Sequence, residues 1–194
     1  EADQLAADAI RPQVLIDETK RASKVDFSGV TLDQSALLDP AKTTACLRDL
    51  KLIGAMLSAA EATGSAAAAL DLIVDYLKTR SQFGKLIGSY QALKHPAVDI
   101  LCAMDSARSL LYHAATLVGD EHLDTDAEIA CRMAKTQATE ALLFAGDRAI
   151  QFHGGMGFTF ECDAQLYLRR AQWLQQHFGD ASHHRKRLAP LLLD

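Results

Sequence analysis

The chain has no block of basic residues. Its 20 lysine and arginine residues are outnumbered by 25 acidic ones, which gives a formal net charge of −5 over 194 residues. Nucleic-acid binding needs clustered basic side chains, so we expect no nucleic-acid partner. A hydrophobic fraction of 49% and a charged fraction of 23% are ordinary for a packed protein and exclude a disordered or fibrous chain. The length suffices for one domain, or for one domain and part of a second.

Long apolar runs and paired cysteines are also missing. We find no apolar stretch approaching the roughly 20 residues that a membrane helix needs, and no secretory signal, so we expect no membrane association. The four cysteines form no C-x-x-C pair and no Cys/His cluster: Cys46, Cys102, Cys131 and Cys162. We therefore expect no metal site, and reduced thiols in a cytoplasmic protein.

The hydrophobic pattern changes near Pro40. Before it, residues 14–16 form a short apolar run, and residues 25–30 alternate apolar and polar as a half-buried strand does. A few strands cannot bury a face alone. We interpret residues 1–40 as the end of a β-rich module and residues 41–194 as a helical domain.

From about residue 42 onward, strong helix formers dominate. Apolar spacing predicts helices over about 43–79, 96–118, 125–152 and 163–177, with a last helix from 182. In the first helix the predicted apolar stripe is Leu50, Ile53, Leu57, Ala60 and Gly64. His183 and His184 belong to the charged last helix, where we expect a solvated face. The pattern predicts a mainly α fold, an antiparallel four-helix bundle with a short β remnant at the N-terminus.

Two connecting segments have compositions suited to ligand binding. The first follows the first helix and contains a cation, an amide and an aromatic ring, a set that can hold a phosphate and stack a ring: Arg80, Gln82 and Phe83. The second follows the third helix, and its glycines let backbone amides approach a ligand: Gly154, Gly155 and Gly157. Taken singly, each has a plainer interpretation, namely a cation at a helix C-terminus and a helix stop.

In order and spacing, the two segments together resemble the acyl-CoA dehydrogenase family, flavin enzymes that oxidise the α,β bond of acyl thioesters. The first family pattern is similar to Arg80-x-Gln82-Phe83-Gly84, followed by Ile87-Gly88-x-x-Gln91. The second is similar to Gln151-x-x-Gly154-Gly155-x-Gly157-Phe158, followed by Glu161 and Tyr167-x-Arg169. The resemblance covers essentially the whole chain.

The resemblance implies a place within a longer protein. Family members have an N-terminal helical domain, a middle β domain and a C-terminal four-helix bundle, so residues 1–40 would end the β domain. It implies FAD as cofactor, an acyl-CoA as substrate and electron-transfer flavoprotein as acceptor. It also implies contacts with the FAD of a neighbouring subunit, in a homo- or hetero-oligomer, by Arg80, Gln82, Phe83, Gln91, Gln151, Gly154 and Gly155.

The family's catalytic base is missing from both of its usual places. Dehydrogenation needs a carboxylate to take the α-proton while the flavin accepts a hydride. Where most members carry this glutamate, the chain has Phe178, and where a minority carry it, in the first bundle helix, it has Gly54 and Ala55. Glu61 lies two turns along and is interpreted as an ordinary helix residue. Asp180 replaces a threonine that contacts the flavin in family members, where a carboxylate would repel the pyrophosphate.

Three hypotheses remain open. The chain could be a subunit that lacks its own base and completes a partner's FAD site, similar to bacterial members acting on steroid side chains. It could instead be a self-sufficient dehydrogenase with Asp180 as a displaced base, two positions from the usual one. It could also be a non-enzymatic helical interaction module. Loss of the base argues against the second hypothesis, and retention of the flavin-contact residues argues against the third.

Overall fold

The computed structural model describes residues 5–119 and 122–193. Within these ranges, two strands precede a series of helices: β1 (Ile10–Gln13), β2 (Ala22–Val25), α1 (Pro40–Thr79), α2 (Gln91–Leu117), α3 (Thr125–His153), α4 (Ala164–Gln176) and α5 (Ala181–Leu193). Two further strands and three short 3-10 helices lie in the connections: β3 (Ser81–Gln82), β4 (Lys85–Leu86), η2 (Gln34–Ala36), η3 (Ile87–Ser89) and η4 (Gly154–Phe158).

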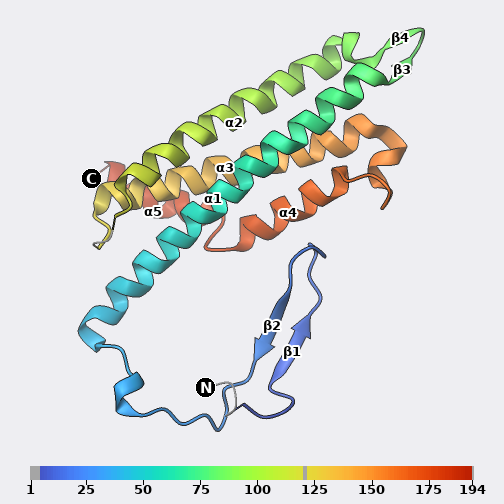
Figure 1. Ribbon diagram of the computed structural model, residues 1–194. Helices are drawn as coiled ribbons and strands as arrows, with labels where there is room; N and C mark the ends of the chain where they lie inside the picture. The colour runs from blue at the N-terminus through green and yellow to red at the C-terminus, as the bar shows by residue number, and fades with distance from the viewer. Residues whose placement is uncertain (1–4, 120–121, 194) are drawn as a thin grey trace.

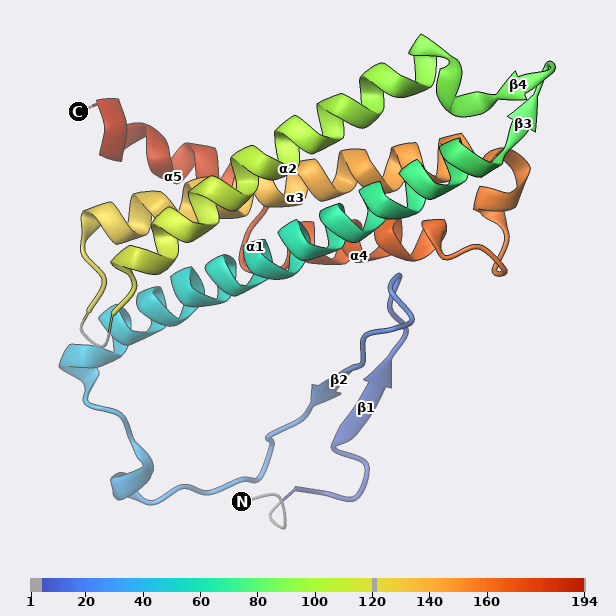
Figure 2. The same ribbon diagram turned by 45° about the horizontal axis from the view of Figure 1, so that its top comes forward.

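Helices α1 to α4 form an antiparallel bundle, as the sequence predicts. Each runs in the direction opposite to the one before it, and α5 closes one end (Figures 1 and 2). Helix α3 packs against all four other helices. Its start and end match the prediction because both are fixed locally. The Asp124 carboxylate accepts a hydrogen bond from the Ala127 amide at 2.8 Å, and Gly154 ends the helix with a φ of 59°.

The bundle core is built from small side chains. On α1 the fully buried alanines are Ala55, Ala59, Ala62, Ala66 and Ala69, and α3 faces the core with a similar alanine series. The predicted stripe on α1 was wrong, since Leu50 and Leu57 are 62% and 60% exposed. Alanine faces let helix backbones approach closely, so the buried side of α1 follows its alanines, together with Leu52, Leu70, Ile73 and Leu77.

The strands lie beside the predicted segments rather than on them. Strand β1 ends before Val14, which is fully exposed in the turn, and β2 ends where the alternating segment begins, at Val25. The two strands pair antiparallel, with Ile10 opposite Val25. Both faces of this ribbon are largely exposed. Among the described residues, no hydrophobic core packs against it, so the positions of its strands do not follow the apolar runs.

Two helix starts also differ from the prediction. Helix α1 begins at Pro40, because the Asp39 side chain accepts a hydrogen bond from the Ala41 amide at 3.0 Å and proline suits the first helical position. Helix α2 begins at Gln91, five residues before Pro96, which therefore lies inside the helix.

The expectation that no apolar run is long enough for a membrane span was wrong. An 18-residue window within Gln34–Thr79 has a mean hydropathy of 1.3, which suffices by length and composition. The alanine face that α1 buries in the bundle contributes to this composition, and 39% of the window is buried. A single such helix does not distinguish a membrane span from a core helix. All four cysteines, two of them exposed, are free thiols.

Candidate functional site

The two segments singled out in the sequence meet at one end of the bundle. They line a shared pocket of about 650 Å³ between the C-terminal ends of α1 and α3. Six of the seven predicted cofactor-binding residues contribute to its wall: Arg80, Gln82, Phe83, Gln151, Gly154 and Gly155. Gln91 does not. It is exposed at the first position of α2, outside this wall.

A tight hairpin shapes the first segment. Arg80 follows the last residue of α1, and strands β3 and β4 pair through the turn at Phe83 and Gly84. Both turn residues have positive φ, 53° and 78°, the backbone of a type I′ hairpin turn. Phe83 is 92% exposed and meets the ring of Tyr90 edge-on at 6.4 Å. The hairpin thus presents an aromatic ring and a guanidinium to solvent beside the pocket.

The second segment has a backbone open to a ligand. His153, the last residue of α3, is buried, stacks on Tyr76 at 4.2 Å and donates from Nδ1 to the Ala149 carbonyl at 2.7 Å. A Cβ atom at Gly154 or Gly155 would meet nothing within 4 Å. His153 therefore fixes the end of the helix, and the two following glycines face free space.

These residues fit an anionic group that carries a flat ring. Arg80 is exposed, and within residues 5–119 and 122–193 its guanidinium forms no ion pair. A guanidinium without a partner suits a pyrophosphate, and the exposed Phe83 ring suits stacking on a planar heterocycle. Arg80 and Phe83 therefore border this pocket with side chains that are open to solvent.

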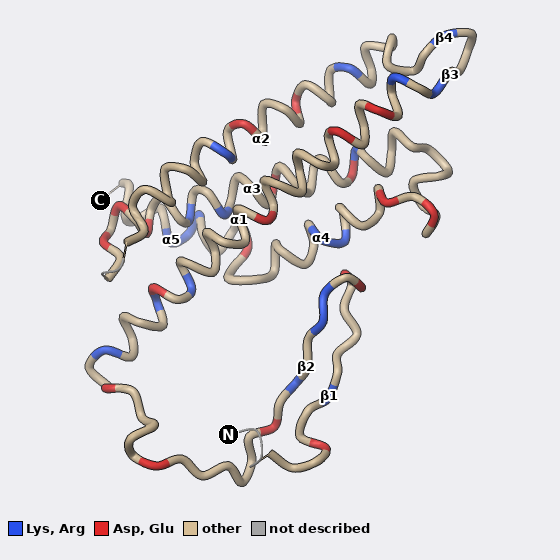
Figure 3. The backbone as a smooth tube through the Cα atoms, in the orientation of Figure 1, with Lys and Arg blue, Asp and Glu red and all other residues tan. Residues whose placement is uncertain are grey.

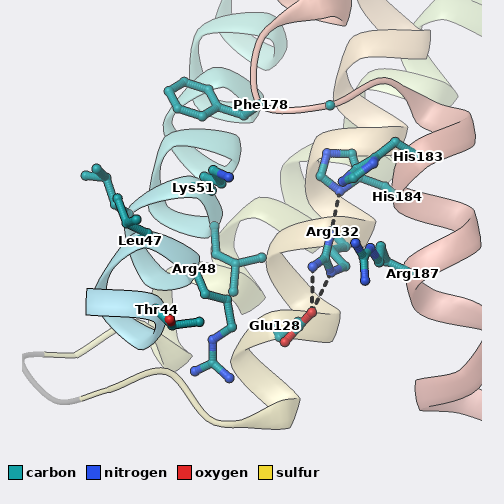
Figure 4. A pocket seen from close by; sticks show the side chains of 13 residues that line it. Thr44, Leu47, Arg48, Lys51, Glu128, Arg132, Phe178, His183, His184 and Arg187 are labelled. Carbon is teal, nitrogen blue, oxygen red and sulfur yellow. Dashed lines mark hydrogen bonds and ion pairs between the residues drawn. The ribbon is translucent and has the colours of Figure 1, made fainter. Parts of the chain in front are cut away.

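The two positions that the family resemblance assigns to the catalytic base lie in contact with each other. Phe178 has a φ of 58°, and its ring covers Gly54 of α1 so closely that a Cβ there would lie 2.5 Å from Cε1. Sequence reasoning had located both positions but not their contact. Phe178 forms part of the wall of a second pocket, of about 880 Å³, between α1, α3 and α5 (Figure 4).

Asp180, the candidate displaced base, has a structural partner. Its Oδ1 atom accepts a hydrogen bond from the His183 amide at 2.7 Å, and its carbonyl accepts one from the His184 amide at 3.0 Å. These are the bonds of an N-cap, so Asp180 starts α5. Its side chain is not part of the wall of the larger pocket.

A buried basic cluster lies beside the larger pocket and was not predicted from the sequence; it consists of Arg132, Lys135 and His184. Lys135 is fully buried and donates to the carbonyls of Leu174 and Gly179, at 2.8 and 3.0 Å, which ties α3 to the end of α4. Burial lowers the pKa of Lys135 to about 8, although Asp180 works to raise it. Arg132 is held by Glu128 through two hydrogen bonds, at 2.6 and 2.8 Å.

His184 belongs to the same cluster. It is 1% exposed, so the expectation of a solvated position on the last helix was wrong. Its Nδ1 atom lies 3.4 Å from Nη1 of Arg132 (Figure 4). Burial, together with the charges of Lys135 and Arg132, lowers the pKa of His184 to about 4. Helix α5 is therefore rich in charged residues but also carries a neutral, buried imidazole, that of His184, which its composition does not predict.

The comparisons with known proteins agree with this architecture. The family model for the acyl-CoA dehydrogenase C-terminal domain matches residues 52–192. Acyl-CoA dehydrogenase IpdE2 of Mycolicibacterium smegmatis is 36% identical over 180 residues, which cover 92% of this chain and 51% of that protein. Acyl-CoA dehydrogenase FadE34 of Mycobacterium tuberculosis is 38% identical over 139 residues, 72% of this chain and 19% of that protein.

Solved structures show the same relationship. Butyryl-CoA dehydrogenase from Megasphaera elsdenii superposes with a TM-score of 0.85 at 25% identity, over 97% of this chain and 50% of that one. The Tcur3481–Tcur3483 steroid ACAD, G363A variant, superposes with a TM-score of 0.76 at 26% identity, over the same shares. The chain spans about half the length of IpdE2 and of these two solved chains. It belongs to the acyl-CoA dehydrogenase family and contains the family's C-terminal helical domain.

Proposed function

We propose that this chain is part of an acyl-CoA dehydrogenase subunit that lacks its own catalytic base and completes the FAD site of a partner subunit. One observation carries the proposal. Phe178 and Gly54 occupy the two places for the base, and they pack on each other, so the aromatic ring fills the space that a carboxylate would need. Neither residue can accept a proton.

The residues of the smaller pocket have a role that needs no base. When FAD is bound, it supplies the hydride acceptor for α,β-dehydrogenation. Arg80 would hold the pyrophosphate, Phe83 would stack on the adenine side, and the exposed backbone at Gly154 and Gly155 would donate hydrogen bonds. Gln82, Gln91 and Gln151 are proposed as further polar contacts to the same partner-bound group. The solvent exposure of Arg80 and Phe83 beside this pocket supports a site shared between two chains.

The alternative with Asp180 as base is disfavoured by its contacts. Its carboxylate already accepts the His183 amide, and removing that acceptor would weaken the start of α5. A helix N-cap is worth about 1 kcal/mol. The third hypothesis, a non-enzymatic module, gives no reason for an exposed arginine, an exposed phenylalanine and open glycine backbone around one pocket.

The remaining assignments extend the proposal. We propose an acyl-CoA as substrate of the assembly, and a bulky acyl group such as a steroid side chain because one solved relative is described as a steroid ACAD. Electron-transfer flavoprotein is the proposed acceptor, and the cytoplasm the proposed location. Residues 1–40 are proposed to end the β domain that precedes the bundle.

The test is co-expression of the full-length protein with a family member that carries the glutamate. The bound flavin and the acyl-CoA-dependent reduction of a dye are measured for wild type and Arg80→Ala. Loss of a charge-assisted contact of about 1.5–3 kcal/mol should weaken flavin binding roughly ten- to hundredfold. The matched control is Arg108→Ala, which removes an arginine paired with Asp105 on α2.

Two outcomes contradict the proposal. If Arg80→Ala leaves flavin content and activity of the complex unchanged, the contact with the partner's FAD is wrong. If the full-length protein alone oxidises an acyl-CoA at an ordinary rate, the inference that it lacks a catalytic base is wrong. The variant Asp180→Asn then tests whether Asp180 is that base.

A further inference from the structure

The turn between α4 and α5 has an unfavourable backbone. Phe178 has a φ of 58° and Gly179 a φ of 102°. Positive φ is common for glycine but strained for a bulky residue such as phenylalanine, and it persists only where surrounding contacts hold it. In this conformation the Phe178 ring lies over Gly54 of α1. The contact between the two positions assigned to the base therefore depends on what holds the turn.

A side chain from α3 holds the turn on both sides of Phe178. The Lys135 amine donates to the Leu174 carbonyl at 2.8 Å and to the Gly179 carbonyl at 3.0 Å. Leu174 lies in the last turn of α4, where carbonyls have no partner within the helix. Gly179 directly follows Phe178. One amine thus ties the end of α4 to the residue after the ring.

The other contacts of the turn come from α4 and α5 themselves. His177 donates from Nδ1 to the Trp173 carbonyl at 3.0 Å, and the Asp180 carboxylate caps α5. A Cβ atom at Gly179 would lie 2.5 Å from Cδ2 of His183, so this position requires glycine. These contacts fix the two ends of the turn. Lys135 adds a contact from the core of the bundle.

The Lys135 amine lies in a costly place for a charge. Its side chain is fully buried, and burial lowers its pKa to about 8. Basic positions of α3 and α5 gather at this end of the bundle (Figure 3), which adds to the cost. An apolar side chain of similar size would avoid this cost. Two hydrogen bonds to carbonyls on either side of Phe178 instead give the amine a geometric role, because they select one arrangement of the turn.

We infer that Lys135 is a positioning residue: by holding the carbonyls of Leu174 and Gly179, it keeps the Phe178 ring on Gly54. For catalysis this inference rests on the proposed function, because it makes the base position closed to an acyl group as well as free of a carboxylate. The contact itself lies within the bundle and needs neither FAD nor a partner chain.

The test is NMR spectroscopy of the isotope-labelled chain, with the α-protons of Gly54 as reporter. The ring current of Phe178 displaces their chemical shifts, and Phe178→Leu gives the shifts without the ring. Lys135→Met keeps the length of the side chain and removes its donors. We expect it to move the Gly54 shifts most of the way to the Phe178→Leu values. The matched control is Lys94→Met, at an exposed position on α2, which should leave them unchanged.

A second variant separates positioning from folding. Lys135→Gln retains N–H donors on a shorter side chain, so it should fold even if Lys135→Met does not, and should also displace the Gly54 shifts. Urea unfolding and the exchange of α3 amides report whether each variant is folded. Wild-type Gly54 shifts in a folded Lys135 variant would overturn the inference. Unfolding of both variants would overturn it too, because Lys135 would then support the whole bundle rather than the turn.

The outcome is independent of the Arg80→Ala experiment. Unchanged Gly54 shifts would remove the role of Lys135 and leave the proposed flavin contact as it stands. Unchanged flavin content in Arg80→Ala would contradict the proposed function and leave the effect of Lys135 on the Phe178 turn measurable.

Discussion

At the scale of single residues, the composition of a segment does not predict which side chains in it are buried or hydrogen-bonded. Phe178 and Asp180 lie two positions apart, in a segment to which the resemblance assigns the catalytic base and a flavin contact, and here one packs on Gly54 and the other caps α5. His184 is neutral and buried within a helix that also carries Arg185, Lys186 and Arg187. The function of such residues follows from their contacts, not from their type.

The buried imidazole of His184 gives a pH prediction. Its pKa is about 4 in the folded protein, against 6.5 for an ordinary histidine, so the unfolded chain binds a proton first as pH falls. Its contribution to stability is complete above pH 6.5 and is lost as pH falls from 6.5 towards 4, by an amount of order 3 kcal/mol. Urea unfolding at pH 7.5, 6 and 5 should show this loss in wild type.

The matched variants are His184→Gln and His113→Gln, the latter at an exposed position on α2. We expect His184→Gln to flatten the dependence of unfolding free energy on pH over this window. His113→Gln should leave it as in wild type. Equal slopes in all three proteins would show that His184 does not titrate as its burial implies.

At the scale of the elements, glycines inside helices differ sharply in what they permit. A Cβ at Gly146 of α3 would lie 2.8 Å from the Leu168 backbone, so α3 and α4 approach each other at that glycine. A Cβ at Gly64 of α1 would meet nothing within 4 Å. Gly146 is therefore needed for the packing of α3 on α4. Gly64 lowers the stability of α1, and within the described residues no close contact requires a glycine there.

The two alanine variants should therefore change stability in opposite directions. Gly64→Ala should raise the free energy of unfolding by about 0.5–1 kcal/mol, because alanine loses less backbone freedom on folding. Gly146→Ala should lower it by about 1–3 kcal/mol, because the new methyl group forces the helices apart. Thermal and urea unfolding of both variants check the signs. A stabilising Gly146→Ala would mean that the α3–α4 contact is looser than described.

The elements also show where sequence reasoning succeeds. Helix α3 was predicted to within a residue because Asp124 and Gly154 fix its ends locally. The Arg80 and Gly154 segments line one pocket, and their contact with FAD, which the family resemblance implies, stays a prediction. The strands and the pairing of Asp17 with Arg170 were missed for a common reason. Asp17 and Arg170 are 153 residues apart, and their pairing depends on tertiary packing that hydrophobic periodicity does not record.

At the scale of the whole molecule, the chain spans about half the length of its solved relatives, which bears on cofactor binding. We expect the isolated chain to bind FAD weakly or not at all, because Arg80 and Phe83, which are proposed to contact FAD, are exposed to solvent. The measurement is the visible spectrum of the protein purified and then mixed with FAD and desalted. A stoichiometric flavin absorbance retained after desalting would contradict the expectation.

The length of α1 sets a spacing between two positions on one chain. Gly54 and Arg80 are 26 residues apart on one continuous helix and its cap, which at 1.5 Å per residue is about 39 Å. No side chain bridges that interval, so under the proposed function the Phe178 position and the Arg80 position would serve different cofactors. In a symmetric pair of identical chains, both catalytic positions would lack a base. In a pair of unlike chains, only the partner's catalytic position would carry a base. The assembly would then have one active site for every two polypeptides.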